Sequence, residues 1–396
     1  MLLKKPSINS FLIFASLFLS SLINYGLVVI VLSFLMMLLV FKLEINKNNL
    51  VVLFTLLGYT SISICSLFFY PNGFFHENQL NSAFANYINI SFMAVFACLF
   101  YQALSRYTTY IFNMLSWVIV AHSLIWITQA ILFFLTSFYL DFHGWFVGEP
   151  SRYLTQGTIG LLKYRFTGIT VEPSTYATTI VLLVLSRLVL SDIVTKNKER
   201  VVSKVDIIGL LTAFFTFSTA SMFYSIAAIL LIYFYRFYDK KHLIFLIAGA
   251  VLTGSLLLSV ISQNIERFSS VSGIRFSFLN YLFNEREDYL FWFGSNLFAL
   301  ERELYTQVYN LAGEARTMAS VNDSGIVPFL MTFTGFSGLV MTLISFYFLL
   351  MCSFPLFVSV LIVSLTKISI YHCLFFVFIC SSVFAFNKRK SSLCLK

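Results

Sequence analysis

The sequence predicts an all-α fold of the membrane class: one integral membrane domain, residues 1–396, built as a bundle of about twelve transmembrane helices with two long loops. The 396 residues are 59% hydrophobic and only 11% charged, which excludes an ordinary soluble globular domain. Apolar runs of about 17 to 25 residues recur from end to end, and a helix of this length crosses a hydrocarbon core of roughly 30 Å. Lys and Arg gather in alternate connections, as in membrane proteins of fixed orientation.

The predicted spans cover most of the chain. The first follows Lys4 and Lys5 and lacks a small-x-small cleavage site, so we interpret it as a retained helix and not as a signal peptide. Two pairs of spans are separated only by short polar breaks, one at residues 218–220 and one near Lys367. The spans are expected at residues 8–23, 25–42, 49–70, 83–101, 110–137, 173–194, 204–217, 221–238, 242–262, 324–350, 354–366 and 369–386.

The distribution of basic residues tests this number of spans. With both termini in the cytoplasm, sixteen of the 26 Lys and Arg residues lie inside and nine outside, and Arg187 lies near the inner end of a span, where it can extend to lipid phosphate. Twelve of the sixteen inner residues are Lys, whereas seven of the nine outer residues are Arg. Because the planar guanidinium suits phosphate and carboxylate, the outer arginines indicate binding. The net charge of +9 follows from orientation, and no nucleic-acid partner is expected.

Two outer loops are long, residues 138–172 and residues 263–323. The second is too long for a simple connection and is expected to be partly helical. Within it, apolar residues recur at spacings of 3, 4, 4 and 3, which predicts an amphipathic helix. This helix lies either at the membrane interface or against the rest of the protein, and the pattern favours neither. Its apolar residues are Leu297, Leu300, Leu304, Val308 and Leu311.

A polar segment leads from the first long loop into the sixth span. Pro173 suits the first helical position and disfavours helical geometry at Glu172, so Glu172 is predicted to be the N-cap residue. An acid at this position can simply complement the helix dipole. Glu is not a favoured N-cap residue, however, and Arg165 lies close to it in sequence. We therefore favour a functional role for the Glu172 carboxylate at the outer mouth of this helix.

The same segment resembles the O-antigen polymerase (Wzy) family, whose members commonly carry an Arg-x-x-Gly-x-x-x-Glu-Pro-Ser-x-x-Ala pattern. The chain matches it at Arg165, Gly168, Glu172, Pro173, Ser174 and Ala177. A Ser-rich turn at residues 218–221 is similar to one in that family and in the related O-antigen ligases. Later residues that resemble the family pattern are Arg275, Gly294, Ser295, Asn322, Asp323, Ser324, Gly325, Gly335 and Gly338. The likeness covers most of the second half of the chain, whereas the first half is similar in hydropathy alone.

The resemblance implies a membrane glycosyltransferase of the bacterial inner membrane with a periplasmic active site. Such a polymerase transfers a growing glycan from undecaprenyl pyrophosphate to the non-reducing end of a lipid-linked repeat unit. The partners it implies are that lipid-linked oligosaccharide and the lipid bilayer. A chain-length regulator protein is a further candidate partner. An O-antigen ligase, which transfers the glycan to a lipid A core, is the nearest rival, although the ligases often carry a His where this chain has Asn322 and Asp323. A flippase for the same lipid is the other alternative.

The resemblance and the chemistry of the transfer together assign roles to particular residues. Arg165 and Arg275 are expected to neutralise charge on the departing pyrophosphate. Glu172 and Asp323 are the candidates for the base that takes the proton of the attacking hydroxyl, although Asp323 can instead cap the tenth span. Residues expected to bind substrate are Arg152, Lys163, Gly168, Ser174, Tyr176, Ser221 and Asn322. We expect no cofactor and no metal, since the acidic run at residues 285–288 lacks an Asp-x-Asp motif.

Overall fold

The structure is a computed structural model. It describes residues 8–23, 25–41, 47–71, 74–75, 77–153, 164–194, 203–236, 279–306, 326–366 and 372–393. Within these ranges the regular elements are helices, and one isolated antiparallel bridge joins Phe75 to Glu301. The described part of the chain is therefore all-α, as predicted. The elements are α1 (Ile8–Ser20), α2 (Gly26–Val40), α3 (Lys47–Ser66), α4 (Glu77–Thr136), α5 (Phe142–Val147), α6 (Pro173–Val194), α7 (Lys204–Phe214), α8 (Thr219–Arg236), the π-helix η4 (Tyr281–Glu285), α11 (Asp288–Phe293), α14 (Ile326–Cys352), α15 (Phe354–Leu365) and α16 (Cys373–Leu393).

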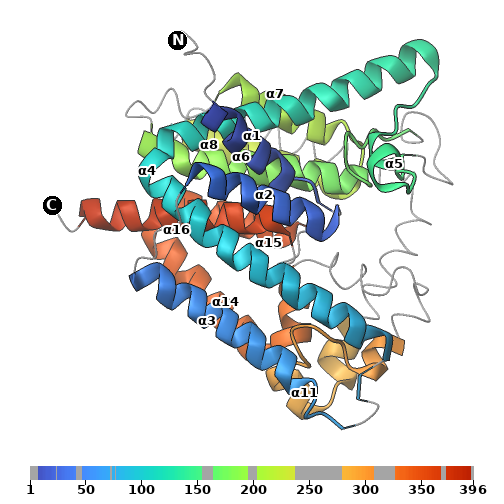
Figure 1. The fold of residues 1–396 in the computed structure, drawn as a ribbon, viewed down its shortest axis with the longest axis vertical. Helices are drawn as coiled ribbons and strands as arrows, with labels where there is room; N and C mark the ends of the chain where they lie inside the picture. The colour runs from blue at the N-terminus through green and yellow to red at the C-terminus, as the bar shows by residue number, and fades with distance from the viewer. Residues whose placement is uncertain are drawn as a thin grey trace.

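The longer helices lie in the regions of the predicted apolar spans, whereas α5, η4 and α11 lie in the two predicted long loops. α6 occupies the predicted residues. A break separates α7 from α8 as predicted, but it falls at residues 215–218, because Thr219 and Ala220 already belong to α8. The two spans expected between residues 83 and 137 form the single element α4, which has 60 residues and is kinked at Tyr107 (φ −131°, ψ 37°). A straight helix of that length would extend for about 90 Å, roughly three times the hydrocarbon core. The kink resolves this mismatch, because the two halves of α4 diverge from it as a V (Figure 1).

Three helical stretches in the described part are long and apolar enough to cross a membrane. They are Ala83–Thr136, Pro173–Ser191 and Phe329–Met351. Shorter apolar helices accompany them: Asn9–Ser20, Gly26–Val40, Ser221–Ile232 and Cys373–Lys388. The chain thus has the character of a helical membrane protein, whereas the total of twelve crossings and the side on which each loop lies stay predictions. The ninth predicted span, residues 242–262, lies outside the described residues.

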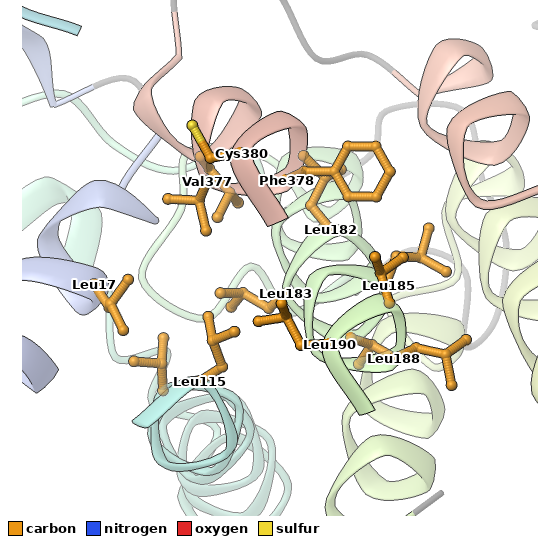
Figure 2. Close-up of a cluster of buried hydrophobic side chains, with 14 of the residues drawn as sticks. Leu17, Leu115, Leu182, Leu183, Leu185, Leu188, Leu190, Val377, Phe378 and Cys380 are labelled. Carbon is orange, nitrogen blue, oxygen red and sulfur yellow. The ribbon is translucent and has the colours of Figure 1, made fainter. Parts of the chain in front are cut away.

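Helix α6 is the centre of the larger cluster of buried side chains. In its apolar stretch 94% of the residues are buried, and α4, α7, α8 and α16 pack around it. Figure 2 shows Leu182, Leu183 and Leu185 of α6 between Leu115 of α4 and Phe378 of α16. Lipid tails are as apolar as leucine, so attraction between such helices comes from close packing of side chains and from hydrogen bonds. Because side chains pack around α6 on all sides, the position of its N-terminus is fixed relative to the bundle.

The buried hydrophobic side chains of the described residues form two clusters. The larger one draws on α1, α2, α4, α6, α7, α8, α15 and α16. The smaller one draws on α3, the start of α4, η4, residues 297–305 and the first part of α14. Helix α4 contributes to both clusters and so joins them. In the apolar stretch of α14 only 11% of the residues are buried, which is expected for a helix that faces lipid.

Arg187 does not extend to lipid phosphate, contrary to the sequence-based expectation. Its side chain is buried and forms an ion pair with Asp206 in the first turn of α7. The Arg187 Nε donates to Ser116 Oγ (2.7 Å), and its guanidinium carbon lies 4.2 Å from the centre of the Phe112 ring. The Asp206 carboxylate also accepts the backbone N–H of Ser203 (2.9 Å). A buried charge is tolerated when an opposite charge pairs with it. Here the opposite charge, Asp206, lies on a different helix.

The amphipathic helix expected from Leu297 does not begin there. Residues 294–300 are irregular, residues 302–306 are helical, and residues 307–311 lie outside the described part. The irregular stretch is tied to α3 by Asn296, whose Nδ2 donates to Ser63 O and to Ser66 Oγ, both at 2.8 Å. The apolar residues Leu297, Leu300 and Leu304 are nevertheless buried in the smaller cluster. The spacing therefore predicted correctly that these three residues are buried. The path of the backbone is set instead by the hydrogen bonds from Asn296 to α3, and it is not helical here.

Candidate functional site

The best-defined polar structure lies directly before α6, in the turn formed by residues 164–172. Side chains from distant parts of the chain hold its backbone. The indole nitrogen of Trp126 donates to Phe166 O (3.2 Å), and the hydroxyl of Tyr25 donates to Ile169 O (2.6 Å). Both donors belong to the helical bundle, so the turn is attached to the packed core and is not a free loop.

Gln129 of α4 makes the largest number of contacts with this turn. Its Oε1 accepts the backbone N–H groups of Thr167 (3.1 Å) and Gly168 (2.9 Å). Its Nε2 donates to Gly168 O (3.3 Å) and to Leu140 O (2.7 Å). The side chain is fully buried, and these four bonds use both of its N–H groups and both lone pairs of its oxygen. A buried amide that is satisfied completely fixes the position of every group it touches.

Gly168 lies directly on the ring of Tyr176, the fourth residue of α6. The φ angle of Gly168 is +59°, and a Cβ at this position would come within 2.8 Å of Tyr176 Cδ2 and 2.9 Å of Cε2. Only glycine combines that backbone conformation with so close an approach. The Tyr176 ring is buried, and its hydroxyl donates to Thr212 Oγ1 (3.0 Å). Gly168 and Tyr176, expected to bind substrate, therefore pack against each other in this structure and support the turn.

Glu172 occupies the position predicted for it, at the start of α6. Helix α6 begins at Pro173, and Glu172 O accepts the first helical N–H, that of Tyr176 (3.1 Å). The carboxylate forms an ion pair with Arg152, and its Oε2 accepts the hydroxyl of Ser174 (3.2 Å). The Glu172 side chain is 19% exposed and that of Arg152 is 56% exposed. This pair is exposed at the protein surface and lies at the N-terminus of α6, the positive end of the helix dipole, where a negative side chain is stabilising.

Arg152 and Arg165 lie on two paired stretches of the first long loop. The N–H of Arg152 donates to Val171 O (2.7 Å), and the N–H of Arg165 donates to Tyr153 O (2.9 Å). Arg165 is partly exposed. The structure thus brings both arginines into the same small unit as Glu172, although they are separated from each other by a dozen residues in sequence.

A second set of contacts joins this unit to α5. Asp141, the N-cap residue of α5, accepts the N–H of Gly144 (2.9 Å) through one oxygen and the N–H of Ser151 (2.8 Å) through the other. The rings of Tyr139 and Tyr153 stack with centres 3.6 Å apart. Burial raises the pKa of the Tyr139 hydroxyl to about 12, so it stays protonated while it contacts Thr167 Oγ1 (2.9 Å).

The remaining predicted residues are not brought to this site by the described structure. Ser221 is fully buried in α8, so direct contact with a ligand does not fit its position. Four others lie outside the described residues: Lys163, Arg275, Asn322 and Asp323. Whether the two long loops form one active site therefore stays a prediction.

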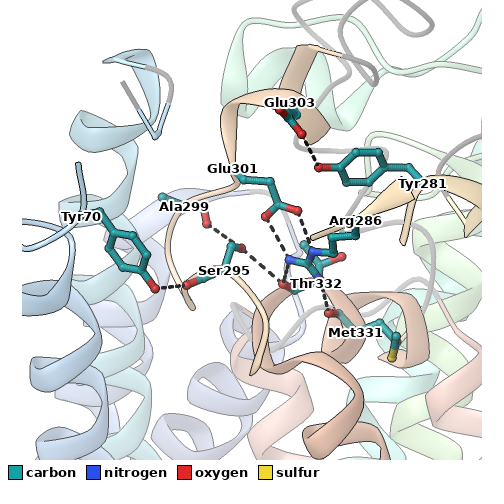
Figure 3. A network of polar contacts seen from close by, with 9 residues as sticks. All are labelled: Tyr70, Tyr281, Arg286, Ser295, Ala299, Glu301, Glu303, Met331 and Thr332. Atoms are coloured by element: carbon teal, nitrogen blue, oxygen red, sulfur yellow. Dashed lines mark hydrogen bonds and ion pairs between the residues drawn. The ribbon is translucent and has the colours of Figure 1, made fainter. Parts of the chain in front are cut away.

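A second polar cluster lies beside a break in α14. Gly335 is non-helical (φ +64°, ψ −165°), and this conformation separates the carbonyls of Met331 and Thr332 from their usual helical partners. Arg286 replaces those partners: its Nη1 donates to Met331 O (2.7 Å) and its Nη2 to Thr332 O (2.8 Å). Arg286 also forms an ion pair with Glu301, with Nε 2.8 Å from Oε1 (Figure 3).

Two glycines make the backbones of this cluster meet. A Cβ on Gly294 would lie 2.4 Å from the carbonyl carbon of Phe333, and a Cβ on Gly335 would lie 2.5 Å from the nitrogen of Gly294. The hydroxyl of Tyr70 donates to Ser295 O (2.8 Å), which attaches the end of α3 to the same place (Figure 3). The Arg286 and Glu301 side chains are almost completely buried, so we assign this cluster to holding the break in α14 and not to direct contact with a ligand. Among the described residues, no group of three His, Cys, Asp or Glu side chains is placed to hold a metal ion.

The fold and the site together define a helical protein of membrane character with an accessible carboxylate–guanidinium pair at the end of its central helix. Comparison with protein-family models, with curated proteins and with solved structures finds no match for the chain. The assignment of a function therefore depends on the chemistry of the residues themselves.

Sequence reasoning missed the residues that fix the turn, above all Gln129. A signal for it was present, because Gln129 carries an amide inside an otherwise apolar span, and such a group must find hydrogen-bond partners when it is buried. The signal does not identify those partners, since Gly168 lies in another element. Tyr25 and Trp126 gave no signal, because aromatic residues are common throughout the chain.

Proposed function

We propose that the chain is a membrane glycosyltransferase that lengthens a glycan carried on a lipid pyrophosphate, at the periplasmic face of a bacterial inner membrane. This is the polymerase reaction implied by the resemblance to the O-antigen polymerases. The observation that carries the proposal is the accessible Arg152–Glu172 ion pair at the N-terminus of the buried apolar helix α6. A lipid pyrophosphate lies at the level where such helices end, so a base and a cation are both needed there.

The reaction exchanges one bond at the anomeric carbon for another. The bond between this carbon and the pyrophosphate oxygen breaks, and its electron pair leaves with the lipid pyrophosphate. The hydroxyl oxygen of the acceptor sugar forms the new glycosidic bond and gives its proton to the Glu172 carboxylate. Arg152 and Arg165 neutralise charge on the departing pyrophosphate, because a planar guanidinium can donate two parallel hydrogen bonds to phosphate oxygens.

The stiffness of the turn supports this proposal. Catalytic groups that are positioned in advance need no reorganisation when charge develops, which is the main source of electrostatic catalysis. The turn before Glu172 is held by Gln129, Trp126 and Tyr25, and Glu172 is held by Ser174. The residues of the family-like pattern also have clear local reasons in this chain, since Gly168 lies on Tyr176 and Pro173 begins α6.

Reconstitution of the purified chain with lipid-linked repeat units tests the proposal. The glycan is expected to lengthen into a ladder without nucleotide sugar or ATP. Glu172→Gln and Arg165→Ala should each abolish the ladder or reduce its rate by about a hundredfold or more, the usual contribution of a positioned base or a charge-stabilising group. Glu149→Gln is the matched control, because Glu149 is an exposed acid of the same loop, and it should leave the ladder unchanged. A normal ladder from Glu172→Gln would contradict the assignment of the base.

The same reconstituted preparation distinguishes the proposed polymerase from two alternative functions. Transfer of the glycan to a lipid A core, without any ladder, would identify a ligase and overturn the polymerase assignment. Movement of the lipid-linked unit across vesicles without any new glycosidic bond would identify a flippase and overturn the assignment as an enzyme.

A further inference from the structure

Helix α5 exposes two large aromatic side chains. Trp145 is 66% exposed and Phe146 is 69% exposed. His143 is buried against the ring of Tyr25, with ring centres 5.3 Å apart, and Phe146 approaches the same ring at 6.5 Å. Gly148, with φ +82°, ends the helix, and the exposed acid Glu149 follows it. Helix α5 is therefore attached to the protein through Tyr25, while most of the surface of its aromatic pair faces outward.

The exposed aromatic side of α5 is continuous in sequence with the outer surface of α4. Phe134 and Leu135, in the last turn of α4, are 64% and 77% exposed, and α4 contains the longest apolar stretch of the described part. Such a surface faces lipid when the helix crosses a membrane. Phe138, between the two helices, is also exposed. The aromatic pair of α5 thus lies directly beyond the end of a lipid-facing surface.

Helix α11 repeats this arrangement in the smaller cluster. Trp292 and Phe293 are exposed, and the Trp292 ring contacts Phe336 of α14, with ring centres 5.4 Å apart. In the apolar stretch of α14 only 11% of the residues are buried. Glu287 and Asp288, at the start of α11, are exposed. Along the chain, acids thus come first and the aromatic pair follows, next to the sparsely buried helix α14, an arrangement that fits a segment at a membrane surface.

We propose that α5 and α11 lie in the lipid headgroup layer, and that α5 thereby sets the depth of the Arg152–Glu172 pair. The occupant of both aromatic surfaces is the lipid bilayer. Tryptophan prefers this layer because its ring is apolar and its N–H is polar. Asp141 transmits the position of α5, because it caps α5 and also accepts the N–H of Ser151, the residue before Arg152. The inference concerns position in the membrane and does not depend on the proposed reaction.

Depth-dependent quenching of tryptophan fluorescence tests this inference. The chain has four tryptophans, so single-tryptophan variants are made by replacing the other three with Phe and are reconstituted in phospholipid vesicles. For Trp145 and Trp292, lipids brominated near the headgroup should quench about twofold more than lipids brominated near the chain end. Trp117, exposed in the middle of a half of α4, should show the opposite order. Trp126, which donates to Phe166 O within the protein, should be quenched weakly by both.

Three results would overturn the inference. Quenching of Trp145 and Trp292 by acrylamide in water, with none by brominated lipid, would place the helices in solvent. Stronger quenching from the chain end would place them in the hydrocarbon. Protection from both quenchers would show that a protein partner covers them. If the single-tryptophan variants fail to fold, the native chain is labelled with lipids that carry a photoactivatable group near the headgroup, and adducts are expected on residues 138–147 and 288–293.

Discussion

Gln129 and Gly168 are joined by two hydrogen bonds of opposite direction. The side-chain oxygen of Gln129 accepts from the N–H of Gly168 at 2.9 Å, while its nitrogen donates to the carbonyl of the same residue at 3.3 Å. The amide of a helix side chain thus pairs with the turn as a neighbouring backbone strand would. The position of Glu172 depends on this pairing, because only three residues separate it from Gly168.

Replacing Gln129 with Met should destabilise the protein strongly. The change keeps the size of the side chain but removes the partners of three buried backbone groups, in Thr167 and Gly168, and of the partly buried carbonyl of Leu140. Each buried group left unsatisfied costs about 1–3 kcal/mol. Thermal unfolding in a fixed detergent measures the loss. The control is Gln102→Met in the other half of α4, where the side chain is partly exposed and a smaller loss is expected. Equal losses in the two variants would contradict the role of Gln129.

Replacing Gly168 with Ala should cost more than the same change at Gly148. Both glycines have positive φ (+59° and +82°), which costs an alanine about 1–2 kcal/mol. A Cβ at Gly148 would meet nothing within 4 Å, whereas a Cβ at Gly168 would overlap the Tyr176 ring. The difference between the two unfolding free energies therefore isolates the steric overlap. It should shrink in a Tyr176→Leu background, where the ring is absent, and a constant difference would argue against that contact.

Replacing Arg286 with Met should destabilise the protein by about 3–5 kcal/mol, because Glu301 would be left as a buried, unpaired charge. The double variant Arg286→Met with Glu301→Leu should be more stable than Arg286→Met alone, since it removes that charge. Arg302→Met is the control, because the Arg302 side chain is exposed and the bonds of its backbone, to Phe74 O and from the Thr306 hydroxyl, are kept by the substitution. A double variant less stable than the single one would contradict the buried-charge explanation, because both variants lose the bonds to Met331 O and Thr332 O and differ only at Glu301.

His143 should make the stability of the protein depend on pH. Burial lowers its pKa below the ordinary value of 6.5, and the nearby acids Asp141 and Glu149 oppose this only in part. Between the lowered pKa and 6.5 the unfolded chain binds more protons than the folded chain, so stability rises with pH in that window and falls as pH drops through it. Unfolding temperatures between pH 5 and pH 7.5 measure the slope. His143→Phe keeps a ring beside Tyr25 and should flatten it, whereas an unchanged slope would assign it to other groups.

Local sequence signals predicted the positions of the helices well. Pro173 marks the start of α6, the break between α7 and α8 lies within a few residues of the predicted one, and the long described helices fall within predicted apolar runs. These signals succeed because each depends on neighbours within one turn or one span. The resemblance pattern from Arg165 to Ala177 likewise lies within one continuous stretch, and the structure places it in one unit at the head of α6.

Contacts between distant segments could not be predicted in the same way. The sequence reveals that Arg187 is a charge within an apolar span, but not that Asp206 of the next helix pairs with it. The spacing of Leu297, Leu300 and Leu304 reveals burial, but not that Asn296 holds their backbone in an irregular path. In each case the deciding bond joins residues that only the folded chain brings together.

The break in α14 also couples the local unfolding of two segments that are distant in sequence, residues 286–301 and the part of α14 around the break. If residues 286–301 detached, the carbonyls of Met331 and Thr332 would lose their donors, and the contact between Gly294 and Gly335 would be lost with them. Neither part can therefore unfold locally at the low free energy that is usual for a loop. In hydrogen-exchange measurements, the amides that surround the break and those of the attached loop should exchange as one unit, more slowly than the exposed helix ends.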